Sequence, residues 1–291
     1  MTYIKKIAIC ISFSCICNQL LAQIDSTRTN VDTIRVGGMV IIKKGKGNDH
    51  TRVTLSNKRK LKKNSVSTSS LIIDLGFANW TDKTDYTAAT SQQYLVSKQG
   101  QPALGSSDFK LRTGKSSNVN IWFFMQRFNL VKHYVNLKYG FGLELNNYRF
   151  SSPVSYKLSG VNPYSPGSFI SHPFVIRDSI NFTKDKLAAD YATIPLMINF
   201  RSNPNSSNKG ISASAGVSLG YLYSSRNKEK SSERGKQKNH GDSNLQPWKF
   251  SYIGELGLGP VHFYGAYAPN SIFDGLFKMM PYTIGFRLSD W

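Results

Sequence analysis

VNLKYGFGLEL, residues 135–145, decides the fold class of this 291-residue chain. Its odd-numbered positions hold Val, Leu, Tyr, Phe, Leu and Leu, and its even-numbered positions hold Asn, Lys, Gly, Gly and Glu. Strict alternation is the period of a β-strand, because successive side chains point to opposite faces of a sheet. A strand of about this length with apolar residues on one face and small or charged residues on the other is typical of a membrane-spanning barrel wall. The segment therefore predicts a transmembrane β-barrel.

Seven further stretches can be read as strands, of which ISASAGVSLGYLY (211–223) alternates most cleanly. We expect eight antiparallel strands near residues 70–80, 117–129, 133–150, 186–200, 209–223, 248–258, 260–268 and 280–289. The connections between them alternate between short and long. Bacterial outer-membrane barrels have short periplasmic turns and long outer loops, and an even number of strands leaves both termini in the periplasm.

Two of these strands depart from clean alternation, and in a third, Val261–Ala268, the inward face is equally ambiguous. In NVNIWFFMQRF (118–128) both faces carry aromatic residues, so the pattern does not assign the inward face. In the strand near 186–200, Asp190 shares the parity of the apolar residues, and Pro195 lacks the N–H that a ladder needs. A proline in a strand predicts a bulge or a weakly paired edge.

The first 23 residues have the features of a cleaved export signal. Lys5 and Lys6 precede an apolar stretch, and LLAQ (20–23) supplies a small-residue cleavage site. A lipoprotein signal is the alternative, but the residues before Cys15 and Cys17 lack the small side chains that such a signal usually has. All three cysteines lie in this segment, so the mature chain is expected to have no disulfide and no thiolate metal site.

The composition excludes a bundle of membrane helices. The mean hydropathy is −0.32, and no run after the signal approaches the roughly 18–20 apolar residues that a spanning helix needs. The net charge of +20 is concentrated in residues 24–69, which we expect to form a mostly disordered basic periplasmic tail, and in RNKEKSSERGKQK (226–238). The second cluster is interpreted as a solvated, flexible loop or as a contact with lipopolysaccharide phosphates, phospholipid headgroups or an acidic envelope component. Nucleic acid is not expected as a partner, because no stacking aromatics are interleaved with the cations.

Four charged residues share the parity of the inward face: Lys138, Glu144, Glu255 and Arg287. We expect these two acids and two bases to form a buried charge network that closes the lumen. The alternative is that one or two of them lie hydrated at the rim. None of the five histidines has a metal-ligand spacing, and no phosphate loop or paired catalytic carboxylates can be identified. No catalytic, cofactor-binding or metal site is therefore predicted.

The chain resembles the small outer-membrane β-barrel proteins of Gram-negative envelopes, which are described as porin-like or PorT-type. The resemblance covers most of residues 70–291. It rests on LLAQ, DTIRVGGMVIIKKG (32–45), LIIDLGFANW (71–80), DKLAADYATIPLMINF (185–200), GELGLGPVHFYGAYA (254–268) and PYTIGFRLSDW (281–291). It implies the barrel class but no particular activity, since such barrels include structural proteins and secretion accessories.

These observations predict a signal peptide (1–23), a basic tail (24–69) and an all-β, eight-stranded antiparallel barrel (70–291) in the outer membrane. Side chains fill the interior of so small a barrel, so free diffusion of solutes through it is not expected. We expect a structural or interaction role, without catalysis, through the outer loops and the basic tail. The partners would be outer-membrane lipid, lipopolysaccharide and other envelope proteins. The alternatives are a narrow porin-like transport or ligand-binding barrel, a secretion accessory and, less favoured, a lipid-modifying barrel enzyme.

Overall fold

The computed structural model describes residues 32–36, 39–43, 65–204, 210–240 and 244–288. The predicted signal peptide, the connector 44–64 and the last three residues lie outside these ranges. The chain divides into two units, 1–63 and 64–291. In the first unit, β1 (Asp32–Val36) and β2 (Met39–Lys43) pair as an antiparallel hairpin that the sequence reading did not predict.

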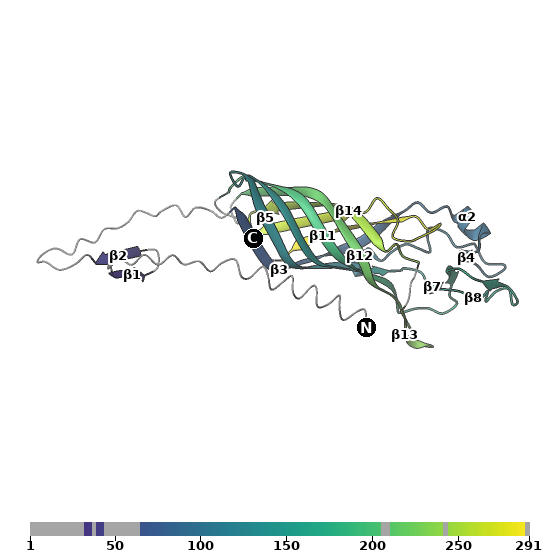
Figure 1. The fold of residues 1–291 in the computed structure, drawn as a ribbon. Coiled ribbons are helices and arrows are strands. Elements are labelled where there is room, and N and C mark those ends of the chain that lie inside the picture. Colours follow the sequence, from purple (N-terminus) through teal and green to yellow (C-terminus); the bar gives the residue numbers. More distant parts are fainter. Residues whose placement is uncertain (1–31, 37–38, 44–64, 205–209, 241–243, 289–291) are drawn as a thin grey trace, which may run out of the picture. The chain divides into compact units, whose positions relative to one another are not determined.

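The second unit is a closed ring of eight antiparallel strands (Figure 1). The ring closes where β16 pairs with β3 and where β11 pairs with both β6 and β12. Its strands are β3 (Val66–Asp82), β5 (Ser117–Val131), β6 (Val135–Arg149), β11 (Lys184–Arg201), β12 (Ile211–Ser231), β14 (Trp248–Leu258), β15 (Val261–Tyr267) and β16 (Met279–Arg287). The predicted eight-stranded all-β barrel is confirmed, with every predicted strand in place.

One predicted loop is wrong. The basic cluster 226–238 was expected to be a flexible connection, but β12 continues to Ser231 and pairs with β13 (Gly235–His240). The two strands form a ribbon that extends the barrel wall. Its ladder hydrogen bonds hold the lysine-rich backbone in extended conformation, although charge and polarity alone favour a solvated loop.

The alternation of side chains separates an apolar outside from a polar inside. Along β6, Tyr139 and Phe141 are exposed, whereas Lys138, Gly140 and Gly142 are buried. The outer surface of the ring carries further exposed apolar residues, among them Leu75, Phe77, Ile194, Leu196, Leu219, Tyr252, Leu256, Ile284 and Phe286. Such a surface would be unfavourable in water and is suited to a lipid environment.

The two irregular strands have different local causes. In β5, the pairing with β6 shifts between Trp122 and Phe124, so Phe123 is an extra residue in a bulge. This shift lets Trp122 point inward while Phe123 and Phe124 are exposed. In β11, the register shift lies between Asp190 and Tyr191, so Pro195 does not form the bulge that was one of its two predicted outcomes; it forms the other, a weakly paired edge.

Pro195 acts on the pairing without shifting the register. β11 loses its pairing with β6 at Ile194 and Pro195 and recovers it at Leu196, while the pairing with β12 continues throughout. The missing proline N–H is therefore accommodated by a local gap on one side of the strand.

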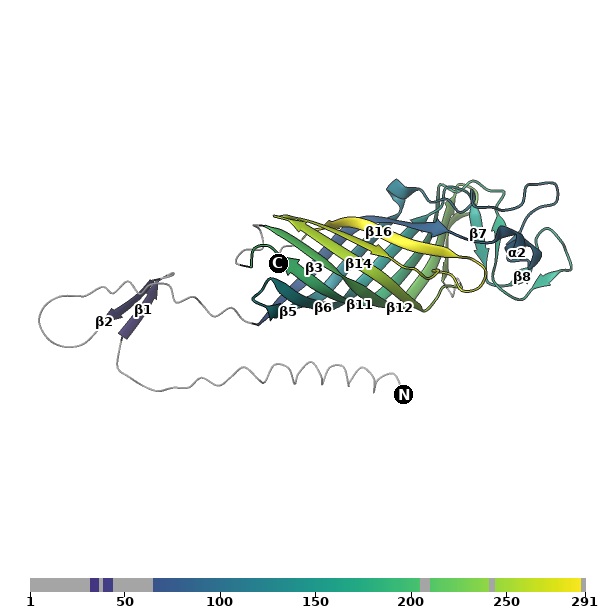
Figure 2. The ribbon, with the colours of Figure 1, turned by 90° about the horizontal axis from the view of Figure 1, so that it is seen from above.

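The connections divide the barrel into two ends. We call the end with the short connections 132–134, 202–210 and 259–260 the turn end, and the opposite end the loop end. Figure 2 shows the long connections gathered at the loop end. They carry α2 (Tyr86–Ser91), β4 (Leu95–Val96), η1 (Thr113–Lys115), β7 (Val154–Lys157), β8 (Gly160–Val161), β9 (Phe169–Ile170) and β10 (Phe174–Arg177). None of the helices in the described ranges is long and apolar enough to cross a membrane.

Candidate functional site

The interior of the barrel is lined by buried polar and charged side chains. These include Asp74, Asn118, Asn120, Lys138, Glu144, Asn146, Asn199, Ser218, Lys249, Ser251, Thr283 and Arg287. They come from positions of the strands that alternate with the exposed apolar ones. Because the apolar residues of each strand face lipid, the polar residues face a narrow interior where water is scarce. Each buried polar group there needs a hydrogen-bond or ion-pair partner.

Three of the four predicted residues belong to one ion-pair group near the turn end of the lumen. Lys138 pairs with Glu255, and Arg287 Nη1 lies 2.6 Å from Glu255 Oε1. Arg287 also donates to Asp74 through Nε at 2.7 Å and Nη2 at 3.0 Å. The side chain of Arg287 is 3% exposed and that of Asp74 is 1% exposed. Two bases and two acids thus balance in a nearly dry environment.

Glu144 lies in a second group. It pairs with Lys249 and accepts a hydrogen bond from Asn146 at 3.1 Å, while the Lys249 ammonium lies 5.3 Å from the centre of the Tyr191 ring. The charges therefore form two groups and not the single network that the sequence predicted. The reason is spacing: Lys138 and Glu144 are six residues apart on one strand, or about 20 Å.

The sequence reading missed Asp74 and Lys249. Lys249 and Glu255 both occupy odd-numbered positions of β14, so the alternation that predicts Glu255 to point inward also predicts this for Lys249. On β3 the alternation does not assign the inward face, because apolar residues occur at both even and odd positions: Ile72 is buried and Leu75 is exposed. Leu71, with a φ of 54°, interrupts the regular strand just before Asp74.

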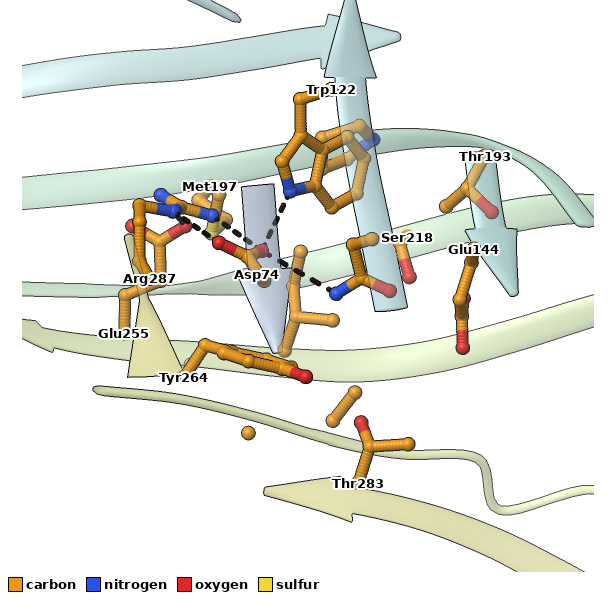
Figure 3. Close-up of a pocket in the computed structure, with 16 residues that line it drawn as sticks. Asp74, Trp122, Glu144, Thr193, Met197, Ser218, Glu255, Tyr264, Thr283 and Arg287 are labelled. Carbon is orange, nitrogen blue, oxygen red and sulfur yellow. Dashed lines mark hydrogen bonds and ion pairs between the residues drawn. The ribbon is translucent and has the colours of Figure 1, made fainter. Parts of the chain in front are cut away.

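Neutral donors complete the coordination of these charges. Trp122 Nε1 donates to Asp74 Oδ2 at 2.7 Å, and the Asn120 amide donates to the same oxygen at 3.4 Å (Figure 3). Asn118 donates to Asn120 at 3.0 Å and to Asn146 at 2.9 Å, and accepts from the Tyr264 hydroxyl. These bonds tie the two charged groups into a connected polar interior.

The Tyr264 side chain lies against two glycines that face each other, Gly76 of β3 and Gly285 of β16. A Cβ at Gly285 would lie 2.2 Å from Leu75 O and 2.6 Å from Tyr264 Cε1. Only glycine leaves room for the aromatic ring where the last strand closes on the first. The closure of the barrel and the position of Tyr264 therefore depend on this pair.

Two small cavities lie among the described residues of the lumen. The cavity in Figure 3, lined by Asp74, Glu144, Tyr264 and Arg287 among others, measures ≈ 30 Å³. A second one toward the turn end, beside Arg127, Arg201 and His262, measures ≈ 20 Å³. Each holds about one or two water molecules. At these two places the side chains leave room for little more than water.

The long connections fold into a cap with its own hydrophobic core. Trp80, Tyr148, Phe150, Phe273 and Phe277 are buried in one cluster that joins the strand ends to the connections. The ring centroids of Trp80 and Tyr148 lie 4.9 Å apart. This cap covers the loop end of the lumen with apolar side chains.

Ion pairs fasten the connections of the cap to one another. Arg177 of β10 holds Asp108 in a bidentate pair, with N–O distances of 2.9 and 2.7 Å, and this hydrogen bonding raises the pKa of Arg177. Arg234 Nη1 lies 2.8 Å from Asp178 Oδ2, which links the β12–β13 ribbon to the connection between β6 and β11. The outer surface of the cap contains a cleft of ≈ 370 Å³ between residues 246–248 and 269–280.

The protein family of this chain follows from a comparison of its sequence with models of known families. A family model described as "Outer membrane protein beta-barrel domain" matches residues 86–274, which is more than half of the chain. The chain belongs to this family. The protein is therefore an outer-membrane β-barrel, as the sequence predicted. The export signal stays a prediction.

The curated proteins give no match, whereas the solved structures that match include one outer-membrane protein. The structure is Ail, the attachment invasion locus protein of Yersinia pestis, with 12% sequence identity and a TM-score of 0.28. The match covers 75% of this chain and 97% of that one.

Within the described ranges, no three His, Cys, Asp or Glu side chains come together in a way that could hold a metal ion. His172 stacks on Tyr94 in the cap, with ring centroids 4.3 Å apart, and His133 lies in a turn between β5 and β6. Asp74, Lys138, Glu144, Lys249, Glu255 and Arg287 form ion pairs with one another in the lumen.

Proposed function

We propose that this outer-membrane barrel does not conduct solutes and acts as an interaction platform through its loop-end cap. The observation that carries the proposal is the filled lumen. Two balanced charge groups, linked through Asn120, Asn118 and Asn146, lie in the interior, and two cavities among the described lumen residues measure ≈ 30 and ≈ 20 Å³.

Energetics favour a lumen that stays closed. Buried ions are tolerable when they are paired and hydrogen-bonded, and separating them would strand charge in a poorly solvated environment. Opening a path for a solute would require Arg287 to leave both Asp74 and Glu255. An eight-stranded ring has no spare diameter to offset this loss.

The cap supports a binding role. A partner that binds a preorganised surface loses less conformational entropy than one that must order mobile loops. The aromatic core around Trp80 and Phe273 and the Arg177–Asp108 pair hold the connections in one arrangement. Outer loops on a rigid barrel are a frequent location for recognition surfaces. The β8–β9 hairpin exposes Val161 and Phe169, which are 60% and 65% exposed.

Planar-bilayer recording tests the closed lumen. The folded protein should add no channel conductance in concentrated KCl, alongside a porin that conducts under the same conditions. Discrete, reproducible conductance steps from the folded protein would refute the filled lumen and favour the transport alternative.

Site-specific photo-crosslinking in intact cells tests the platform. A photoreactive residue at Phe169 should yield a discrete adduct that is lost when Phe273→Ala disorders the cap. The matched control carries the crosslinker at Lys132, an exposed residue of the turn end. The absence of an adduct at Phe169, or adducts that survive loss of cap order, would argue against binding through the cap.

A further inference from the structure

Three neighbouring strands at the loop end carry lysines in register. On β11 and β12, Lys184 lies opposite Lys230 and Lys186 lies opposite Lys228. On β12 and β13, Lys230 lies opposite Lys236 and Lys228 lies opposite Lys238. We call these six residues the lysine grid, because they form two rows of three. Neighbouring strands lie about 4.8 Å apart and the rows about 7 Å apart, so six cations share a small area.

The grid lies on the outer face of the wall. Lys184 and Lys186 have the same parity on β11 as the exposed residues Ile194 and Leu196. Lys230, Lys236 and Lys238 are exposed, and the other three are partly exposed. The grid therefore continues, beyond the apolar band, the surface that faces lipid.

The acidic residues of the same strands do not neutralise the grid. Asp185 and Glu229 are buried on the opposite face, and Glu233 lies in the turn between β12 and β13. Asp190, on the outer face, pairs with Arg226 at 3.3 Å. Within the described part of the chain, none of the six lysines forms an ion pair with a carboxylate, and the Lys186 ammonium contacts only the neutral amide oxygen of Asn147.

The position along the wall matches the headgroup layer. On the outer face of β12, the exposed Leu219, Tyr221 and Tyr223 precede the cations, and Tyr221 packs against Trp248 with ring centroids 4.9 Å apart. Such aromatic residues mark the membrane interface in outer-membrane barrels. Lys186 lies four residues beyond Asp190. Because the strand is tilted, the row of Lys186, Lys228 and Lys238 therefore lies about 10 Å further than Asp190 from the apolar band.

Folding does not account for this arrangement. Like charges directly opposite each other on neighbouring strands are destabilising. Arg149 adds a fourth cation to the first row, because it lies opposite Lys186 on β6. A multivalent anion would remove the repulsion in both rows at once, and clustered cations next to a membrane attract anionic lipid.

We propose that the lysine grid binds the phosphate groups of lipopolysaccharide in the outer leaflet. Long loops face outward in this class of barrel, so the grid adjoins the outer leaflet and not the phospholipid of the inner one. Lipopolysaccharide offers several phosphates next to its acyl chains. The acyl chains can pack on the aromatic band while the phosphates bind the two lysine rows.

The test measures lipopolysaccharide binding to the folded full-length mature protein in zwitterionic detergent. The grid variant is Lys186→Gln/Lys228→Gln/Lys238→Gln. The control, Lys98→Gln/Lys110→Gln/Lys278→Gln, removes the same charge from exposed cap lysines outside the grid. The grid variant should bind purified lipopolysaccharide at least about tenfold more weakly than the wild type, and the control should stay within about twofold. Lipopolysaccharide stripped of phosphate should bind wild type and grid variant equally weakly.

Three outcomes would overturn the proposal. Equal losses in both triple variants would indicate a net-charge effect, and undiminished binding of phosphate-free lipid would indicate acyl contacts alone. Inorganic pyrophosphate that binds as tightly as lipopolysaccharide would identify a soluble anion as the ligand. Misfolding does not confound the test, because removing opposed like charges should leave the grid variant at least as heat-resistant as the wild type without lipid. The heat-modifiable gel band measures this directly.

Discussion

Replacing Arg287 with leucine should destabilise the barrel strongly. Arg287 makes three short contacts, at 2.7 and 3.0 Å to Asp74 and at 2.6 Å to Glu255, and its side chain is 3% exposed. Removing one partner of a buried ion pair typically costs about 3–5 kcal/mol, because the other charge is left uncompensated. The variant should lose about this much free energy of unfolding.

A second substitution identifies the stranded charge. Glu255 keeps its pairing with Lys138 when Arg287 is removed, whereas Asp74 keeps only the neutral donors Trp122 and Asn120. Asp74→Asn should therefore recover more of the lost stability in the Arg287→Leu background than Glu255→Gln does. A double-mutant cycle should give a coupling of about 1–3 kcal/mol for Arg287 with Asp74.

The assay is reversible urea unfolding in detergent micelles or liposomes, followed by tryptophan fluorescence and the heat-modifiable gel band. Arg112→Leu, at an exposed position of the cap, is the matched control and should change the free energy of unfolding by less than about 0.5 kcal/mol. A cost below about 1 kcal/mol for Arg287→Leu would show that this guanidinium is hydrated. That result would also remove the main support for a filled lumen.

Three further predictions concern closure, cap and orientation. Gly285→Ala should prevent folding of the ring, because the new Cβ would lie 2.2 Å from Leu75 O. The control Gly254→Ala should fold, because the atom nearest to its new Cβ is 3.8 Å away. Equal yields of the heat-modifiable band from the two variants would contradict the prediction. Phe273→Ala should cost the cap core about 3–5 kcal/mol and speed amide exchange in the long connections while the ring stays folded, and unchanged exchange there would speak against the cap core. In intact cells, a membrane-impermeant maleimide should label Ser232→Cys at the ribbon tip and spare Lys132→Cys at the turn end, and the reverse pattern would invert the topology.

Much of the barrel could be predicted from the sequence, because a barrel wall imposes its two environments residue by residue. Lipid on one face and a narrow interior on the other force the period-two pattern seen in residues 135–145 and 211–223. Strand positions, their number and the inward parity of Lys138, Glu255 and Arg287 all follow from local alternation. The alternation was irregular at Leu71 in β3 and Phe123 in β5, where the local backbone is irregular, and at Asp190 in β11, beside a register shift.

The partners of the charged residues could not be predicted, because they are set by the register of strands far apart in the chain. Asp74 and Arg287 are separated by 213 positions and meet only because β16 closes on β3. Glu144 and Lys249 meet across the lumen, not along a shared ladder. The lysine grid is likewise a product of pairing, since nothing in residues 226–238 specifies that β11 lies alongside with two more lysines. Alternation is local and determines which face a side chain takes, whereas ring closure and cross-strand register determine which charges come within reach of one another.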